Sequence, residues 1–393
     1  MSTTYTPTLS EELLTHCGER APIYDRENRF CQEDFDELKK AGYLLMGVPQ
    51  KFGGQGMTIA EVARATRRLA YYAPATALCI NMHNYWVGVA ADIYRTGDRS
   101  TEWILERAGK GDVFAAGHAE QGNDVPLLYS TTKAERVEGG YRFHGRKSFG
   151  SLTPVWDWLG IHGMDSSDPN NPKIVHGFMR RDTPGYKIKE TWDVLGMRAT
   201  RSDDTILEDV FVPDDRIVRI LPAGFGGADF FVLCIFAWAD IGFANVYYAI
   251  AQRALDLTIE AAKQKTSIAM MNRPMSHHPE MQHGIGEMIL ELDTIGPHLE
   301  KIAEDWSNGV DYDHEWSSKI VSLKYHTVES AWKIVDRALE LSGGFGMFKK
   351  SELEHLFRDA RAGRFHPANS ALTHEIVAKT ALGLNLDEQP RWG

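Results

Sequence analysis

Short polar side chains follow a glycine in the segment 195-LGMRATRSDDTILEDVFVPDD, which then alternates like a strand and closes with Val-Pro. Arg198, Thr200 and Ser202 could present hydrogen-bond donors to an anionic or carbonyl-rich ligand. The same residues would also suit a solvated turn before an edge strand. The segment therefore predicts a turn that either binds a ligand or only joins two elements.

Two glycine-containing segments could bring the backbone close to a phosphate. The run Gly343-Gly344-Phe345-Gly346 removes the Cβ atoms that would block such an approach. It would equally serve as a helix C-cap, because a glycine ends many helices. The pair Gly122-Asn123 is typical of a turn.

Histidines and cysteines give no metal signal. His118, His277, His278 and His283 are expected at the surface or in loops, and no His-Glu-x-x-His motif is present. The four cysteines form no Cys-x-x-Cys pair, so neither a disulfide framework nor a structural zinc site is predicted. This cysteine usage favours a reducing, cytoplasmic setting.

The chain has 393 residues, 43% of them hydrophobic, which indicates a globular protein of two or three domains. Its net charge of −11, without a basic run, disfavours nucleic acid and anionic membranes as partners. No targeting signal is evident at the N-terminus, and no stretch approaches eighteen uninterrupted apolar residues. We expect an untargeted protein without a membrane span.

The hydrophobic period changes twice along the chain, which predicts three domains of an α+β protein. Residues 1–112 have helical spacing, residues 113–222 alternate like strands of a β-barrel or sandwich, and residues 223–393 return to helical spacing. Paired glycines at 139–140 predict a hairpin. The last part contains four long helical segments that suit an antiparallel four-helix bundle, at 235–263 and about 280–306, 314–342 and 368–382.

Four segments in order make the chain resemble the acyl-CoA dehydrogenase superfamily of flavoproteins. They are 42-GYLLMGVPQKFGGQGM, 139-GGYRFHGRKSF with 156-WDWLGIHG, the segment from 195, and 338-ALELSGGFGMFKKSELEHLFRDAR. The resemblance covers nearly the full length. It implies an N-terminal α-domain, a middle β-domain, a C-terminal four-helix bundle and a homotetramer, or at least a dimer.

By this resemblance the flavin ring lies between the β-domain and the bundle. Glu120, Gly122 and Asn123 would line it, and backbone amides of 117–124 would bind its pyrimidine edge or phosphate, although the family's longer Glu-Pro-x-x-Gly-Ser-Asp run is shortened here. Phe149 and Ser151 would lie near the flavin N5 atom. Arg198 and Thr200 become candidate flavin contacts.

The adenosine end of FAD would reach Gly343, Gly344 and Gly346 from a neighbouring subunit. Lys265 stands where the family has an arginine, and Glu340 where it has a glutamine. Lysine keeps the charge but lacks the bidentate fork of arginine. The expected cofactor is therefore FAD or FMN.

Dehydrogenases of this family remove an α-proton from an acyl thioester with a glutamate, and that residue is missing here. Pro367 stands at its expected position, and the alternative position near Val232 is not acidic either. A general base must lie within about 3 Å of the proton that it takes. The sequence thus lacks the usual base.

Another branch of the superfamily, the two-component flavin-dependent monooxygenases, resembles the chain at His83, Ser151 and His366. In that branch a reductase supplies reduced flavin, oxygen adds at flavin C4a, and these side chains would act in catalysis. Histidine suits this task, because its ordinary pKa near 6.5 lets it hold an oxyanion or donate a proton. Both histidines also have plain alternatives, His83 as a satisfied helix residue and His366 as a loop or capping residue.

The leading hypothesis is thus a reduced-flavin-dependent monooxygenase for a small apolar or aromatic substrate, with a flavin reductase as partner. A dehydrogenase of acyl-CoA or acyl-carrier protein, with Asp240 or Glu375 as a displaced base, is the first alternative. A flavin-binding relative without turnover is the second. The aromatic residues that could line the substrate cavity are Tyr85, Trp86, Phe236 and Trp238.

Overall fold

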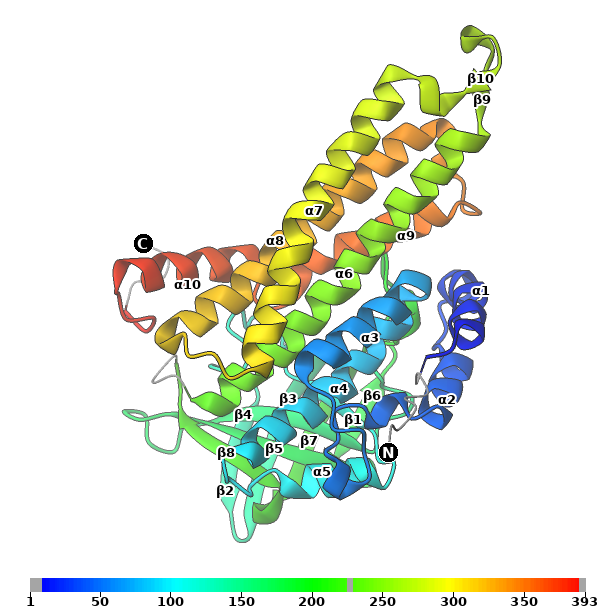
Figure 1. Ribbon diagram of the computed structural model, residues 1–393. Coiled ribbons are helices and arrows are strands. Elements are labelled where there is room, and N and C mark those ends of the chain that lie inside the picture. Colours follow the sequence, from blue (N-terminus) through cyan, green and yellow to red (C-terminus); the bar gives the residue numbers. More distant parts are fainter. Residues whose placement is uncertain (1–8, 225–228, 389–393) are drawn as a thin grey trace, which may run out of the picture.

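A computed structural model of the protein describes residues 9–224 and 229–388. Helices come first, a sheet follows, and long helices complete the chain, as expected from the periodicity. In Figure 1 the sheet lies at the lower end and the long C-terminal helices rise from it. The N-terminal helices are α1 (Glu11–Glu27), α2 (Gln32–Lys40), α3 (Ile59–Tyr72), α4 (Pro74–Arg95) and α5 (Glu102–Gly109).

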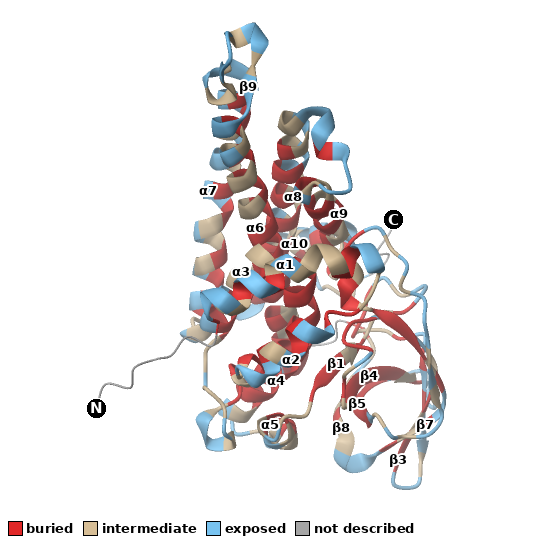
Figure 2. Ribbon diagram, turned by 90° about the vertical axis from the view of Figure 1, so that its right-hand side faces the viewer, coloured by how far each residue is buried: buried red, intermediate tan, exposed pale blue. Residues whose placement is uncertain are grey.

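One mixed sheet forms the middle of the molecule, with the strand order β6-β7-β3-β2-β4-β5-β8 and with β1 beside β4. The β1–β4 pairing is parallel, and the predicted hairpin is the β2–β3 pair, whose turn residue Gly139 has φ +77°. Figure 2 shows the sheet curled, with β5 and β8 on one side and β3 and β7 on the other. The strands are β1 (Phe114–Gly117), β2 (Lys133–Val137), β3 (Gly140–Gly150), β4 (Trp158–Asp165), β5 (Lys173–Arg180), β6 (Tyr186–Lys189), β7 (Asp203–Pro213) and β8 (Ile217–Pro222).

The C-terminal part contains a short helix of 11 residues, α9 (Glu352–Ala362), that the periodicity did not predict. This helix, α9, contacts both α6 and α8, whereas the segment expected as the fourth bundle helix forms α10 and packs against α8. A small hairpin of β9 (Thr266–Ser267) and β10 (Arg273–Pro274) caps the far end of the bundle. The helices are α6 (Phe230–Gln264), α7 (Pro279–Ser307), α8 (Trp316–Ser342), α9 (Glu352–Ala362) and α10 (Ser370–Leu382).

Helix α4 joins the sheet to the bundle, and two glycines explain how closely it packs. A Cβ atom at Gly88 would lie 2.2 Å from the ring of Trp238 in α6, and one at Gly160 in β4 would lie 2.4 Å from the ring of Trp86. The indole nitrogen of Trp86 also donates to the carbonyl of Ala115, at 3.0 Å. Large side chains that fill the space left by glycines therefore hold the three parts together.

Helix α6 is apolar enough in composition to cross a membrane, but 78% of its most apolar window is buried inside the protein. Its buried residues face α3, α4, α7, α8 and α9. Such burial is typical of the core helix of a large bundle. Composition alone would have misread this helix.

Candidate functional site

The end of strand β3 exposes an aromatic surface where the resemblance places the flavin ring. Phe149 has φ +56° and is 62% exposed, and its ring meets that of Trp192 edge-on, with centroids 5.8 Å apart. Leu195 beside them is 59% exposed. An exposed apolar surface of this kind suits a flat ring that would cover it.

A chain of three hydroxyl groups runs inward from Ser151. The Oγ atoms of Ser151 and Ser202 lie 2.7 Å apart, and Ser202 Oγ lies 2.7 Å from Thr200 Oγ1, which donates to the carbonyl of Met197 at 2.9 Å. Each hydroxyl has one hydrogen. Because Thr200 uses its hydrogen on Met197, Ser202 donates to Thr200 and Ser151 donates to Ser202. The oxygen of Ser151 is therefore left as an acceptor.

Arg198 is directed toward the N-terminal part of the chain. Its guanidinium donates to the carbonyls of Asp25 and Val194, at 2.9 and 2.7 Å, and to the carboxylate of Asp193 at 3.0 Å. These bonds engage the group that the sequence offered as a ligand donor. They favour the structural alternative for Arg198, whereas Thr200 lies at the inner end of the hydroxyl chain.

The turn that carries these residues is held by α9. Arg358 donates to both carboxylate oxygens of Asp25, at 2.8 and 2.6 Å, and to the carbonyl of Leu195 at 3.0 Å. Asp359 accepts the backbone N–H of Met197 at 2.5 Å. The motifs around 195 and 358, far apart in sequence, thus form one junction between sheet and bundle.

Gly196 is the point of closest approach in this junction, so we expect Gly196→Ala to destabilise the protein. A Cβ atom there would lie 2.2 Å from the carbonyl oxygen of Arg358 and 2.7 Å from the backbone nitrogen of Asp359. Backbone atoms cannot rotate away, and overpacking of this kind costs about 1–3 kcal/mol. Chemical denaturation measures the loss. Gly286→Ala is the matched control, because a Cβ atom there meets nothing within 4 Å; equal losses in both variants would contradict the expectation.

Asp25, His355 and Asp359 lie as close together as a metal site would require. Among the described residues they are the one group of three His, Cys, Asp or Glu side chains whose possible metal-ligand atoms all lie within 4.8 Å of one another. His355 Nε2 lies 3.2 Å from Asp359 Oδ2, and Arg358 already pairs with Asp25. Although burial opposes it, the Asp359 carboxylate raises the pKa of His355. The guanidinium and this imidazole supply positive charge to the two carboxylates.

The side chain of Glu120 points into the protein. Its carboxylate accepts hydrogen bonds from Lys147 Nζ at 2.5 Å, from the hydroxyls of Ser130 and Thr132, and from the backbone N–H groups of Thr131 and Thr132. Burial raises the pKa of Glu120, but Lys147 and these donors outweigh it and hold the pKa at about 2. The side chain thus anchors the loop, and only its backbone remains for the flavin contact that the resemblance implies.

The two residues that follow in this loop have different roles. Gly122 has φ +80° and open space where a Cβ atom would lie. Asn123 donates to Glu120 Oε2 at 3.0 Å and to the carbonyl of Tyr129 at 2.7 Å. The turn prediction is confirmed, and the amide of Asn123 serves the shape of the loop.

His118 lies in the loop that follows β1, as expected, but its ring belongs to an interior cluster of histidines. His118, His162 and His176 have ring centroids 5.4–6.4 Å apart, and the last two face each other across β4 and β5. Burial and the charge of Lys147, among other groups, lower the pKa of all three, that of His176 to about 3. Sequence reading missed this cluster, whose only signal was two histidines at inward positions of neighbouring strands.

His83 is fully buried in α4, and the protein backbone uses both of its ring nitrogens. Nε2 donates to the carbonyl of Leu44 at 2.9 Å, and Nδ1 accepts the N–H of Phe114 at 3.1 Å. Burial lowers its pKa to about 4. These bonds favour the alternative of a satisfied helix histidine over a catalytic role.

His366 lies in the loop between α9 and α10, against one face of α6. Its ring stacks on Phe243 with centroids 4.4 Å apart, and Nε2 lies 2.8 Å from the hydroxyl of Tyr247. Lys324 of α8 donates to the carbonyls of His366 and Ala368, at 2.7 and 3.0 Å. Burial and the Lys324 charge lower the pKa of His366 to about 3. The imidazole is therefore neutral and held on two sides.

The two candidate displaced bases differ in their surroundings. Glu375 pairs with Lys379 of the same helix at 2.9 Å. Asp240 of α6 is 1% exposed, and neither of its oxygens has a hydrogen-bond partner among the described residues. Burial raises its pKa to about 8, against the opposing influence of Lys324. Asp240 is therefore the unsatisfied carboxyl group of this region.

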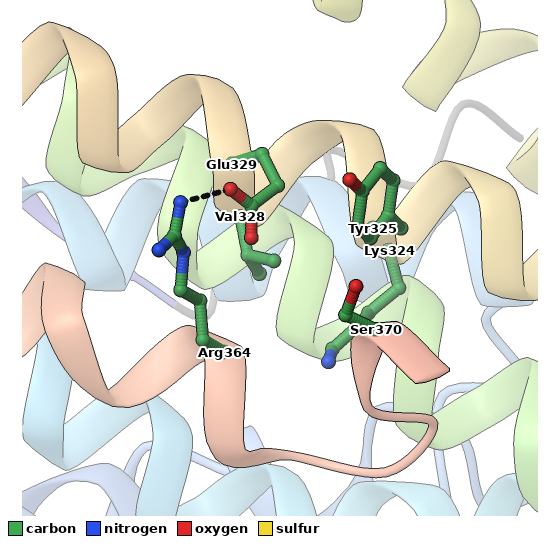
Figure 3. Close-up of a pocket in the computed structure, with 6 residues that line it drawn as sticks. All are labelled: Lys324, Tyr325, Val328, Glu329, Arg364 and Ser370. Atoms are coloured by element: carbon green, nitrogen blue, oxygen red, sulfur yellow. Dashed lines mark hydrogen bonds and ion pairs between the residues drawn. The ribbon is translucent and has the colours of Figure 1, made fainter. Parts of the chain in front are cut away.

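A cavity of about 250 Å³ lies between α8 and the segment that carries Arg364 and Ser370 (Figure 3). An ion pair between Arg364 and Glu329 forms one wall, and Lys324 lies below Tyr325 near Ser370. Lys324, which lines this cavity, also donates to the carbonyl of His366. The lining residues are Lys324, Tyr325, Val328, Glu329, Arg364 and Ser370.

The glycine run after α8 agrees with its helix-cap alternative. Gly343 is the C-cap of α8, with φ +67°, and its N–H donates to the carbonyl of Glu340. Gly344 has open space for a Cβ atom, whereas one at Gly346 would collide with Ser342. Phe345, Met347 and Phe348 beside the glycines are 54–77% exposed. Lys265 is the C-cap residue of α6 and is exposed.

Two family models match this chain, at its two ends. The model described as "Acyl-CoA dehydrogenase, N-terminal domain" covers residues 8–102, and "Acyl-CoA dehydrogenase, C-terminal domain" covers residues 241–371. Together they span more than half of the chain. They flank the strand-rich middle and include all of α4, the part of α6 from residue 241 onward, and His366.

Similar proteins match this chain over most of the length of both chains. YdbM of Bacillus subtilis (strain 168), which is assigned to the acyl-CoA dehydrogenases, is 27% identical, over 90% of this chain and 91% of that protein. Isobutylamine N-hydroxylase of Streptomyces viridifaciens is 24% identical, over 89% of each chain. The solved structure of KijD3 with FMN and dTDP-3-amino-2,3,6-trideoxy-4-keto-3-methyl-D-glucose is 24% identical and has a TM-score of 0.83, over 96% of this chain and 93% of that one.

The fold, the order of its motifs and the matches at both ends agree. The relatives include both an acyl-CoA dehydrogenase and an N-hydroxylase, so the family leaves the reaction open. The chain therefore belongs to the acyl-CoA dehydrogenase superfamily of flavin-dependent oxidoreductases.

Proposed function

We propose that the protein is a monooxygenase that uses reduced FMN or FAD, supplied by a separate reductase, to oxidise a small, partly apolar substrate. The observation that carries this proposal is the state of the loop where the family's dehydrogenases have their glutamate. Pro367 stands there, and the chain has no acidic residue between Asp359 and Glu375. The neighbouring titratable group is instead the neutral His366.

A neutral histidine of low pKa is unsuited to dehydrogenation. Removing a proton from carbon needs a base whose pKa is near or above the working pH. With its pKa at about 3, His366 would not keep such a proton. It can still hold a polar substrate or oxygen atom by a hydrogen bond, because Tyr247 and Phe243 fix its ring.

The hydroxyl chain also fits a reduced flavin. Reduced flavin carries a hydrogen on N5, and Ser151 has an acceptor oxygen left after donating to Ser202. Phe149 and Trp192 supply the apolar surface that would hold the ring. Flavin supplies the electrons and the reaction with oxygen, and these residues would orient it and exclude water.

Two similar proteins support this proposal. One is an N-hydroxylase, and the other binds FMN together with an amino sugar. Both resemble this chain over most of its length. A reductase partner and assembly as a homotetramer or dimer belong to the proposal and rest on the family resemblance.

Butyryl-CoA and oxygen separate this proposal from the dehydrogenase alternative. We expect anaerobic butyryl-CoA to leave the absorbance of bound oxidised FAD or FMN unchanged. With reduced flavin and air, we expect the protein to release hydrogen peroxide at least about tenfold more slowly than free flavin does, because the site shields the ring.

Ser151→Ala should restore much of the fast release, whereas Ser148→Ala, three residues earlier on β3, serves as the control. Bleaching of the flavin by butyryl-CoA would overturn the proposal in favour of a dehydrogenase. Failure to take up any flavin would overturn it in favour of a relative without turnover.

A further inference from the structure

Asp240 presents a buried carboxyl group that the protein itself does not satisfy. It is 1% exposed, neither oxygen accepts a hydrogen bond from a described residue, and no ion pair involves it. Most buried polar groups are paired, since an unpaired one costs about 1–3 kcal/mol and an unpaired charge costs more. An exception of this kind indicates a group kept for a ligand.

The position of Asp240 on α6 places it on the face that holds His366. Phe243 and Tyr247 follow it by three and seven residues, which is the spacing of one helix face. Phe243 stacks on the His366 ring, and Tyr247 hydrogen-bonds to it. The unsatisfied carboxyl group thus lies on the same side of the helix as the residues that the proposed reaction uses.

Lys324 is the positively charged group that acts on Asp240, but it forms no ion pair with the Asp240 carboxyl group. Lys324 acts on it electrostatically, but its ammonium donates to the carbonyls of His366 and Ala368. The titratable groups that face this region are Lys324, His366 and Tyr247. Of these, Lys324 is committed to the backbone, and the other two bond to each other.

We propose that Asp240 binds the amino group of a small amine substrate and holds it beside His366. This inference rests on the proposed function. An ammonium group offers three N–H donors to two empty acceptor oxygens, and Phe243 on the same face adds an aromatic ring that attracts a cation. A neutral alcohol or an anionic substrate would leave the carboxylate poorly satisfied.

The same contact explains how the amine would become reactive. When the carboxylate takes one proton from the bound ammonium, the products are a carboxylic acid and a neutral amine with a free lone pair. No electrons move in this step. Burial favours the protonated form of Asp240, so this transfer is less unfavourable than it would be with an exposed carboxylate. That lone pair is what an oxygen-transfer reaction requires.

Binding of n-butylamine, compared with n-butanol as its neutral analogue, tests the inference by titration calorimetry. We expect the wild-type protein to bind n-butylamine more tightly, and Asp240→Asn to weaken this binding about tenfold to a hundredfold while n-butanol is unaffected. Asp305→Asn is the matched control, because Asp305 on α7 is also buried but pairs with Lys301 and Tyr312.

Stability separates a binding role from a structural one. Asn keeps the shape of Asp240 and removes a carboxyl group that makes no hydrogen bond, so we expect Asp240→Asn to unfold at the same temperature as wild type or higher. A marked loss of stability, or equal binding of n-butylamine by wild type and Asp240→Asn, would overturn the inference.

The two proposals can fail separately. Oxygen-dependent oxidation of a neutral substrate without selective amine binding would overturn this inference and leave the monooxygenase proposal intact. Amine binding that depends on Asp240 in a protein whose flavin is bleached by butyryl-CoA would overturn the monooxygenase proposal. The binding site would stand in that case.

Discussion

Replacement of Lys147 by methionine lowers the free energy of unfolding by about 3–5 kcal/mol, because it leaves the Glu120 carboxylate buried without its cation. Lys147 is 1% exposed, and the Glu120 side chain is wholly buried. The pair also anchors the loop where the resemblance places the flavin, so flavin affinity should fall with stability. Urea denaturation of the flavin-free protein measures the first effect.

A double variant is the control for this prediction. Lys147→Met with Glu120→Gln removes both charges, and the remaining hydroxyl and N–H donors can still bond to the amide oxygen of glutamine. We expect the double variant to be more stable than Lys147→Met alone. If the two were equally unstable, packing of the lysine stem rather than the charge pair would dominate.

Mild acid destabilises the protein through its buried neutral histidines. His176 has its pKa lowered to about 3, chiefly by burial, and that of His83 is lowered to about 4. The unfolded chain takes up protons below about pH 6.5, but the folded protein does not. Stability therefore falls as the pH drops from 6.5 toward these values. Each such histidine costs about 2 kcal/mol at pH 5.

Two carboxyl groups act in the opposite direction. Burial raises the pKa of Asp240 to about 8 and that of Asp34 to about 6, so both favour the folded state as the pH falls below these values. A single variant isolates the histidine effect. We expect His176→Leu to lose about 2 kcal/mol less stability between pH 7 and pH 5 than wild type does.

Phe178→Leu, on the same strand, is the control for that comparison. It has no titratable group and should lower stability equally at both pH values. Urea denaturation at pH 7 and pH 5 gives the three differences. An unchanged pH dependence in His176→Leu would mean that the histidine is protonated in the folded protein.

The layout of the fold could be predicted because local pattern reflects which side of an element is buried. A period of two between 113 and 222 and a helical period elsewhere place strands and helices without knowledge of their partners. Short elements escaped this reading. Strand β1 has only four residues, and α9 follows α8 after a short glycine-containing turn.

The candidate site divides in the same way. The resemblance assigns the motifs at 147–151 and 195–202 to the flavin, and the structure brings both to one place through the Ser151–Ser202 contact. The sequence could not show that Glu120 points inward or that backbone groups hydrogen-bond to both ring nitrogens of His83. Side-chain direction depends on the strand or helix packed above it, which only the tertiary structure supplies.

The sequence by itself determined the succession of helices and strands, the resemblance to one superfamily and the absence of an acidic residue at the usual base position. These follow from residue types and their order. Tertiary structure decided which polar groups are satisfied. His162 meets His176 because β4 pairs with β5, and Tyr247 meets His366 because α6 packs against the loop that follows α9. Hydrogen bonds depend on distances between segments, and spacing along the chain does not contain those distances.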